Sequence, residues 1–376
     1  MFEIQNSRKT IVISAVNLNI GGTLTILNDC LRYLSELALE GNYKVIALVY
    51  KQELADYPNI EYIETQWPKK RWINRLWYEY VSMEKISREI GPVYLWLSLH
   101  DTTPNVIAER RAVYCHNPFP FYKWKWRECF FAPKIVLFAL FSRFIYQKNI
   151  HRNDMVIVQQ QWLKDSFQSL FNLDKNRIVV AVPDVKEVDF SHNGVQIPSK
   201  DYEFVYAASP NSHKNFECIC RAVELLEERD GLTNFKVNIT INGKENKYAK
   251  WLIKNWGHCS ALNFVGFLDR TKLFGYYTTS NCLIFPSKVE TWGLPISEFS
   301  ILDKPMLLAD LSYAKETAAG SKYVAFFDPD RPDVLARQMK QLIEGDLSFL
   351  KVVPGVPIGG PVAHSWEKLF RILLKP

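Results

Sequence analysis

The chain has 376 residues, of which 48% are hydrophobic and 23% charged, with no low-complexity tract and no evident internal repeat. This composition is typical of a globular protein, and at about 150 residues per domain the length predicts two domains. The formal net charge of +6 is too small by itself to indicate a nucleic-acid-binding protein.

The seven cysteines are scattered and form no paired C-x-x-C spacing, so we expect reduced thiols, a cytosolic compartment and no zinc site. The longest apolar run, residues 135–141, is far shorter than the ~20 residues that a membrane-spanning helix requires. The apolar run near the first residues is too short for a secretory signal. We therefore expect no membrane span.

Short β-branched apolar runs recur along the chain, separated by longer amphipathic stretches. In the first half they are residues 10–16, 44–50, 93–99, 112–115, 155–158 and 177–182; in the second half, residues 203–208, 236–241, 262–265, 281–285 and 305–309. Runs without strict alternation suit strands buried on both faces, and the stretches between them suit crossover helices. The sequence thus predicts an α/β protein with two doubly wound parallel sheets and a break within residues 184–204.

Ligands of such sheets bind beyond the carboxyl ends of the strands, so the loops after the strands carry the candidate sites. Gly21 and Gly22 follow the first run and open a helix whose free N–H groups favour an anion, although a plain tight turn explains them equally well. Lys214 lies where a helix begins after the run 203–208, well placed for a phosphate. A solvated surface lysine is the alternative.

The stretch "SKVETWGLPISEF", residues 287–299, follows the run that ends at Pro286. Because Pro295 suits a first helical turn, we predict a loop over 287–293 and a helix over 296–302. Glu298 then lies in the first turn and Glu290 in the loop. One carboxylate could accept hydrogen bonds from ligand hydroxyls and the other could lie near a reacting carbon, or Glu298 could complement the helix dipole and Glu290 cap a turn.

The segment "PSKVETWGLPISEFSILDKPMLLAD" closely resembles the E-x7-E signature of family 4 retaining glycosyltransferases, which have the GT-B fold. Further segments occur in the order of that family: "HKNF", "ITING", "NFVGFLDRTKLFGYY", "FFDPDRPDVLARQM" and "HSWEKLFRILL". The resemblance covers nearly all of the second half and is patchier in the first. It implies two Rossmann-like domains that face each other across a cleft, an acceptor-binding domain over 1–190 and a nucleotide-sugar-binding domain over 191–362, with a C-terminal helix over 363–376 crossing back.

The resemblance also implies roles for single residues. Glu298 would bind the ribose hydroxyls, Lys214 the diphosphate, and Glu290 would face the donor sugar. The backbone of Trp292, Gly293 and Leu294 would lie beside the sugar and phosphate. From the first half, Gly22 would bring its backbone to the donor and His116 would contact the sugar, although a histidine at a strand end can also be purely structural.

One position departs from the family pattern. Many members have an arginine about six residues before the phosphate-binding lysine, where this chain has Ala208 and Ser209. Phosphate charge would then be met by Lys214, backbone N–H groups and Lys288.

The chemistry follows from charge. As the glycosidic bond breaks, the sugar becomes oxocarbenium-like and the diphosphate gains negative charge, which fixed donors stabilise more than the ground state. Lys214 and helix N-termini can supply these donors, and the Asp-Pro-Asp at 328–330 belongs to a different family segment. We therefore expect no divalent metal and no cofactor, and by resemblance we expect transfer with retained configuration.

Residues 119–152 are rich in basic and aromatic side chains, with a single acid, Glu128, and residues 67–78 repeat this composition. Such segments suit the headgroup region of an anionic membrane, where each basic residue adds ~1 kcal/mol. We predict membrane contact through Lys123, Trp124, Lys125, Trp126 and Arg127. The alternatives are aromatics that fill the core beside solvated basic residues, or RNA binding, for which no recognised motif is present.

Together these observations predict a cytoplasmic, peripheral-membrane, retaining glycosyltransferase of the hexosyltransferase type. It would use a nucleotide sugar and a glycan acceptor, which we expect to be lipid-linked, and no nucleic acid. Its pathway would be surface polysaccharide biosynthesis, such as that of O-antigen or capsule. Two alternatives stay open: a GT-B sugar-nucleotide epimerase, and a non-catalytic relative that binds nucleotide or membrane.

Overall fold

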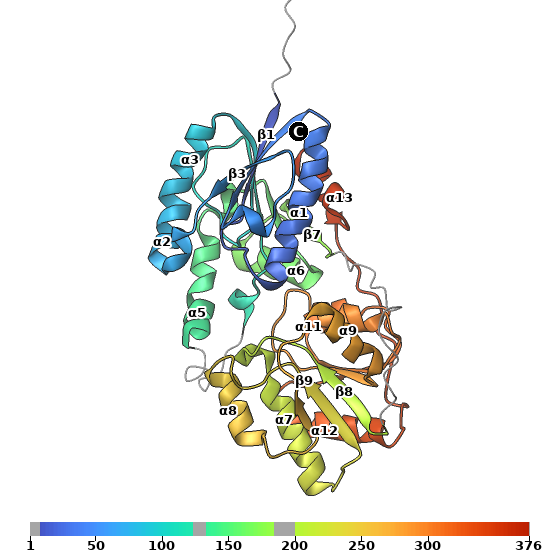
Figure 1. Cartoon of the computed structure of the whole chain (residues 1–376). Coiled ribbons are helices and arrows are strands. Elements are labelled where there is room, and N and C mark those ends of the chain that lie inside the picture. The colour runs from blue at the N-terminus through green and yellow to red at the C-terminus, as the bar shows by residue number, and fades with distance from the viewer. Residues whose placement is uncertain (1–7, 123–132, 184–199, 376) are drawn as a thin grey trace, which may run out of the picture. The chain divides into compact units, whose positions relative to one another are not determined.

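A computed structural model describes residues 8–122, 133–183 and 200–375, and the chain divides into two compact units. Unit 1 comprises Met1–Asn117, Phe141–Asp184 and Ile358–Pro376, and unit 2 comprises Pro118–Leu140 and Val185–Pro357. Both are labelled by element in Figure 1. Among the helices described, none combines the length and the hydropathy that a membrane-spanning helix needs.

Unit 1 contains an eight-stranded parallel sheet in the order β14-β7-β6-β5-β4-β1-β2-β3. The strands are β1 Lys9–Ser14, β2 Tyr43–Val49, β3 Ile60–Glu64, β4 Val93–Ser98, β5 Arg110–Tyr114, β6 Met155–Val158, β7 Ile178–Ala181 and β14 Val362–Ala363. The central strands are apolar without alternation because helices cover both faces of the sheet. Every residue of β4 is buried.

The helices of unit 1 pack on the two faces of this sheet. They are α1 Gly21–Leu39, α2 Trp72–Trp77, α3 Met83–Ile90, α6 Gln161–Phe171 and α13 Trp366–Leu373, with the short turns η1 Gln52–Leu54, η2 Trp67–Lys70, η5 Ile150–Arg152 and η6 Lys175–Arg177. A π-helical turn, η3 Tyr78–Ser82, joins α2 to α3. Helix α5, Pro133–Gln147, belongs to unit 1 from Phe141 onward. Successive residues of β1 point to opposite faces, so Ile11 and Ile13 pack in one core cluster and Val12 in the other.

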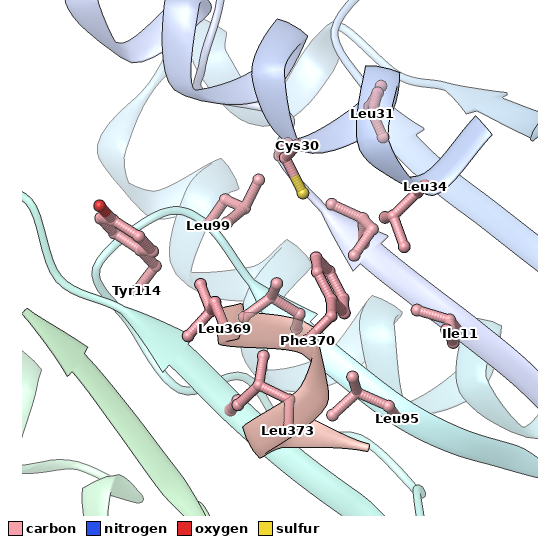
Figure 2. Close-up of a cluster of buried hydrophobic side chains, with 14 of the residues drawn as sticks. Ile11, Cys30, Leu31, Leu34, Leu95, Leu99, Tyr114, Leu369, Phe370 and Leu373 are labelled. Atoms are coloured by element: carbon pink, nitrogen blue, oxygen red, sulfur yellow. The ribbon is translucent and has the colours of Figure 1, made fainter. Parts of the chain in front are cut away.

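The C-terminal helix α13 lies in the core of unit 1. Leu369, Phe370 and Leu373 are buried among side chains of α1 and of the sheet, as Figure 2 shows. The ring of Phe370 stacks on Tyr33 with centroids 5.5 Å apart. The prediction that this helix crosses back to the first domain is confirmed.

Unit 2 contains a six-stranded parallel sheet in the order β10-β9-β8-β11-β12-β13. Its strands are β8 Tyr202–Tyr206, β9 Phe235–Ile239, β10 Leu262–Phe264, β11 Cys282–Phe285, β12 Met306–Ala309 and β13 Val324–Phe327. Its helices are α7 Phe216–Glu224, α8 Lys247–Trp256, α9 Arg270–Thr279, α10 Leu294–Ser300, α11 Ser312–Thr317 and α12 Pro332–Ile343, with the turns η4 Phe119–Phe121, η8 Ser212–Lys214 and η9 Leu225–Arg229.

All of the predicted runs are strands, with ends within two residues of those expected. The prediction missed β3, β13 and β14. Strand β3 is an edge strand whose residues are only partly buried, so it lacks the continuous apolar run of a central strand, and β14 has only two residues.

The observed division differs from the predicted domains in two described segments. Residues 358–362 were expected in the second domain but belong to unit 1. Residues 118–122 and 133–140 were expected in the first domain, but their contacts place them in unit 2. Tyr122 and Ala139 form a small buried cluster with Val289, and Phe119 packs against it. The predicted boundary at 190/191 lies within residues 184–199, outside the described residues.

Candidate functional site

The order of strands in the second sheet reverses between β8 and β11, which are neighbours in the sheet although β9 and β10 lie between them in the sequence. Ligands of open parallel sheets bind at such a switch point, beyond the carboxyl ends of the two strands. The loops at this position are residues 207–215 after β8 and residues 286–293 after β11. They contain Lys214 and Glu290.

Lys214 ends the turn η8 and is held by its main chain. The hydroxyl of Tyr206 donates to the Lys214 carbonyl at 2.7 Å. The next residue, Asn215, has left-handed φ and ψ angles of 59° and 39°, a conformation that asparagine tolerates. Its side-chain amide donates to the carbonyls of Pro286, at 3.2 Å, and Pro329, at 2.8 Å. This asparagine therefore ties the lysine loop to the loop after β11.

Lys214 and Glu290 form an ion pair, with Nζ 2.5 Å from Oε1. The buried hydroxyl of Ser287 donates to the same oxygen at 2.7 Å. The two charged side chains are 17% and 14% exposed, so both remain within reach of a ligand. Because a lysine ammonium carries three donors, Lys214 can bind a second acceptor while it keeps Glu290.

Glu298 is the fifth residue of α10, which begins at Leu294. The prediction that the helix begins at 296, with Glu298 in its first turn, is wrong. Gly293 is the N-cap with φ of 89°, so the helix starts directly after it and takes in Pro295. Glu298 therefore lies beyond the first turn, where an interaction with the helix N-terminus weakens.

The carboxylate of Glu298 is 3.6 Å from a guanidinium nitrogen of Arg270, the first residue of α9. Burial raises the pKa of Glu298, and Arg270 opposes that rise. A mostly buried carboxylate with one distant cation retains acceptor capacity for hydroxyl groups.

The turn Trp292–Leu294 is fixed by hydrogen bonds from two helices. The hydroxyl of Thr317 donates to the Trp292 carbonyl, and the Trp292 indole donates to Ser297 at 3.2 Å. A Cβ at Gly293 would lie 3.3 Å from a methyl group of Ile296, in addition to its positive φ. The turn is therefore held in a conformation that favours glycine.

His213 precedes the lysine and is packed among aromatic rings. Phe119 and Tyr122 lie edge-on to its imidazole, at centroid distances of 5.1 and 6.2 Å. Burial, with Lys214 adding to it, lowers the pKa of His213 to about 3. Its Nδ1 atom is buried and has no hydrogen-bond partner among the described residues. His213 is thus neutral near pH 7 and adds no cation to the site.

Two further positions bear on phosphate binding. Lys288 lies 3.8 Å from Asp330, so its charge is partly matched. At Ala208, one of two positions where the family pattern leads us to expect arginine, the main-chain N–H donates to the Thr240 hydroxyl at 3.0 Å. Of the two lysines in the loops at the switch point, Lys214 is the one paired with Glu290.

The first sheet reverses its strand order between β1 and β4. Helix α1 begins at Gly21, as predicted, with φ of 61° at that residue. A Cβ at Gly22 would meet no atom within 4 Å. The backbone at this helix start is therefore open to a ligand.

A closed polar network fills the carboxyl end of β4. The Thr102 hydroxyl donates to Glu79 at 2.7 Å, so its oxygen accepts from His100 Nδ1 at 3.0 Å. On its other side, His100 Nε2 lies 3.0 Å from the Ser14 hydroxyl, which accepts from the Trp96 indole at 3.2 Å. These contacts fix the orientation of the His100 ring between Thr102 and Ser14.

Arg75 completes this network. Its Nε donates to Glu79 Oε1 at 2.8 Å and its terminal nitrogen to the His100 carbonyl at 2.9 Å. Burial alone would raise the pKa of Glu79, but Arg75 and His100 more than offset it and lower the pKa to about 2. Glu79 is therefore a permanently charged side chain that is 1% exposed.

The network holds the loop that positions His116. Asp101, with φ of 71°, accepts from the main-chain N–H of His116 at 2.7 Å and lies 3.6 Å from its Nε2. Burial lowers the pKa of His116, against the opposing charge of Asp101. Its Nδ1 atom is buried and finds no partner in the part of the chain that the structure describes, so a ligand hydroxyl could satisfy it.

The structure thus brings together Lys214, Glu290, Trp292, Gly293 and Leu294 in unit 2, with Glu298 one helical turn further on. In unit 1, Gly22 and His116 follow strands β1 and β5. The predicted membrane contacts Lys123, Trp124, Lys125, Trp126 and Arg127 lie outside the described residues. Sequence reasoning missed Arg270, Ser287 and Asp101, although Asp101 closely follows the buried run of β4.

The two sheets and their switch points define a two-domain α/β protein, and comparison with known proteins identifies its class. Residues 187–351 match the family described as glycosyl transferases group 1, a range that includes Lys214, Glu290 and Glu298. This part of the chain is therefore similar to group 1 glycosyltransferase domains.

Among curated proteins, the chain is similar to the O-antigen chain mannosyltransferase RfbU of Salmonella typhimurium, with 22% identity over 251 residues. The match covers 66% of this chain and 65% of that protein, which is less than two thirds of the relative's length.

Solved structures align with almost all of the chain. Sucrose-phosphate synthase from Thermosynechococcus elongatus is 14% identical, with a TM-score of 0.65 and 92% of each chain covered. HepE of Anabaena, solved with UDP and glucose, is 13% identical, with a TM-score of 0.61 and coverage of 91% and 92%. The lipopolysaccharide outer core galactosyltransferase WaaB is 12% identical, with a TM-score of 0.59 and coverage of 90% and 91%. The chain therefore has the GT-B fold.

Proposed function

We propose that the protein is a family 4 retaining glycosyltransferase that moves a sugar from a nucleoside-diphosphate sugar to a glycan acceptor. The observation that carries this proposal is the Lys214–Glu290 pair at the switch point of the second sheet, inside the part of the chain that is similar to group 1 glycosyltransferase domains. Glu290 and Glu298 would be the two acids of the E-x7-E signature.

The donor would be held by groups of unit 2. Lys214 binds the diphosphate and Glu298 accepts hydrogen bonds from the ribose hydroxyls. Glu290, fixed by Ser287, faces the sugar beside the turn at Gly293. The HepE structure, a complex with UDP and glucose, supports a nucleoside diphosphate as the ligand of such a fold.

Catalysis follows from the position of Lys214. Bond cleavage places additional negative charge on the leaving diphosphate, and a fixed ammonium stabilises that charge more than the ground state. We propose that this role requires no divalent metal. Glu290 stabilises the positive charge that develops on the sugar, and the acceptor attacks from the face that the diphosphate leaves, so the configuration is retained.

The acceptor and its location are proposed from the relatives. RfbU is named as an O-antigen chain mannosyltransferase and WaaB as a lipopolysaccharide outer core galactosyltransferase. We accordingly assign the protein to surface polysaccharide biosynthesis, with a lipid-linked glycan acceptor at the cytoplasmic side of a membrane. Gly22 and His116 are the unit 1 residues assigned to donor contact.

The test is the thermal stability of the purified protein with UDP, GDP, ADP and CMP at equal concentration. A ligand at about 100 times its dissociation constant adds about 2.7 kcal/mol of stability. We expect one diphosphate to raise the melting temperature and Glu298→Ala to abolish the rise, whereas the control Glu344→Ala, at the exposed end of α12, retains it.

The corresponding sugar nucleotide, supplied with an acceptor glycan, should give a product with the anomeric configuration of the donor, and EDTA should not slow its formation. Binding of none of the four nucleotides, or transfer with inversion, would contradict the proposal. Release of free sugar or an epimerised nucleotide without acceptor would favour the epimerase alternative.

A further inference from the structure

The helical segment formed by α2, η3 and the start of α3 is apolar on two opposite sides. One side carries Tyr78 and Met83 into the core of unit 1. The other side carries two pairs of apolar residues, each pair four residues apart. They are Trp72 with Leu76 and Ile73 with Trp77. Ile73 is 70% and Trp77 61% exposed. Residues four apart form one stripe, so this is a continuous apolar face directed to solvent.

Helix α5 repeats this arrangement. Val136, Ser142 and Tyr146 are buried, while Phe141 and Phe144 are more than half exposed. The chain just after α5 meets η3, because the ammonium of Lys148 lies over the Tyr80 ring, 4.1 Å from its centroid. Both helices are labelled in Figure 1. We name one set of exposed side chains the α2–α5 face: Trp72, Ile73, Leu76, Trp77, Phe141 and Phe144.

The exposed charges of the two segments that carry this face have one sign. Lys69, Lys70 and Arg71 lie immediately before α2 and Arg143 lies on α5, all exposed. Within residues 66–82 and 133–152, which the structure describes, the only acid is Glu79, and it is buried against Arg75. Large exposed apolar side chains on two segments whose exposed charges are all basic are unusual on a surface that meets only water.

We propose that the α2–α5 face docks unit 1 on an anionic phospholipid bilayer. Tryptophan and phenylalanine side chains enter the region between headgroups and acyl chains, and basic residues bind the headgroup phosphates. A second copy of the chain is a poorer partner, because two such faces would bring like charges together. The proposal deepens the proposed function by naming the surface that brings the enzyme to a lipid-linked acceptor, but it does not depend on catalysis.

The experiment is co-sedimentation of the full chain with vesicles of phosphatidylcholine alone and with about one third phosphatidylglycerol. We expect at least about tenfold stronger binding to the anionic vesicles. The double variant Ile73→Gln/Trp77→Gln should bind the anionic vesicles at least about tenfold more weakly than the wild type, because it removes the most exposed apolar groups of α2. Phe267→Gln, a highly exposed apolar residue of unit 2, is its control.

The double variant Lys70→Ala/Arg71→Ala should weaken binding about 25-fold at low salt, since each basic residue accounts for about fivefold. Lys250→Ala/Lys254→Ala on α8 changes the net charge equally and should have little effect. Unfolding curves verify that each variant folds.

Equal binding to both vesicle types, or full binding by Ile73→Gln/Trp77→Gln, overturns the proposal. A wild-type dimer in sedimentation that this variant converts to a monomer, without vesicle binding by either, assigns the face to self-association and also overturns it. Nucleotide binding is measured without vesicles, so a failure here is distinguishable from a failure of the proposed function.

Discussion

The two sheets reverse their strand order in the same manner. The polar side chains at the two switch points differ in whether a ligand can reach them. In unit 1, Glu79 and His100 are almost fully buried and each hydrogen-bonding group of the pair has a partner within the protein. In unit 2, Lys214 and Glu290 are paired but partly exposed. A closed network can fix a backbone, whereas a pair that water reaches can exchange one contact for a contact with a ligand. The comparison indicates that the first network is a support and the second a binding site.

The largest effect should come from Glu79→Ala. Removal of one partner from a buried ion pair leaves Arg75 uncompensated and costs about 3–5 kcal/mol of unfolding free energy. Glu84→Ala is a matched control, because Glu84 also pairs with an arginine four residues away, but on the exposed side of α3. We expect less than about 1 kcal/mol for that control in urea unfolding. Equal losses for both variants would contradict the description of a buried network.

The next largest effect should be the loss of nucleotide binding in Lys214→Met. Loss of a charged donor to the diphosphate should weaken nucleotide binding by about 1.5–3 kcal/mol, or roughly 10- to 150-fold, in calorimetric titration. Lys272→Met, an exposed lysine of α9, provides the control. An unchanged dissociation constant would show that the diphosphate binds elsewhere.

His213 should make the protein sensitive to mild acid. Its pKa is lowered to about 3 in the folded state, so between about pH 6.5 and 3 the unfolded chain binds the additional proton. The free energy of unfolding is therefore unaffected by protonation of His213 above about pH 6.5. It falls as the pH falls below that value, by up to about 1.4 kcal/mol per pH unit. His213→Asn should flatten the pH dependence of urea unfolding between about pH 7 and 5. The exposed His364→Asn should leave it unchanged, and identical curves for wild type and His213→Asn would refute the assignment.

The smallest effect should come from Arg270→Ala. Arg270 opposes the burial that raises the pKa of Glu298, and it is more than half exposed, so its loss should cost less than about 1 kcal/mol of nucleotide binding. Because the pKa of Glu298 then rises further, the loss should be greater near pH 6 than near pH 8. Titrations at both pH values measure this difference, and a loss independent of pH would exclude an effect through Glu298.

The sequence predicts the sheets well because central strands of a parallel sheet are apolar on both faces, so each leaves a continuous run. Edge strand β3 leaves none. Lys214 and Glu290 are predictable because they follow strands and lie in a segment that resembles a known family. The start of α10 was misplaced because the positive φ of Gly293, which sets the helix start, is a property of the folded turn.

The network around Glu79 was beyond sequence reasoning for a different reason. Glu79 lies 21 residues before His100, on a helix whose i,i+4 arginine would suit an exposed pair equally well. Nothing local distinguishes the buried pair Arg75–Glu79 from the exposed pair Glu84–Arg88. The difference arises only when α2 packs on the sheet and closes the polar groups of β1 and β4 beneath it.

The placement of α13 in the core of unit 1 has a consequence for synthesis. Leu369, Phe370 and Leu373 pack against α1, more than 300 residues earlier in the chain. While the polypeptide grows on the ribosome, the first sheet can form only with this part of its hydrophobic surface uncovered. All strands of unit 2 are translated before β14 and α13, so the unit whose first seven strands are made before any strand of unit 2 is the last to complete its core.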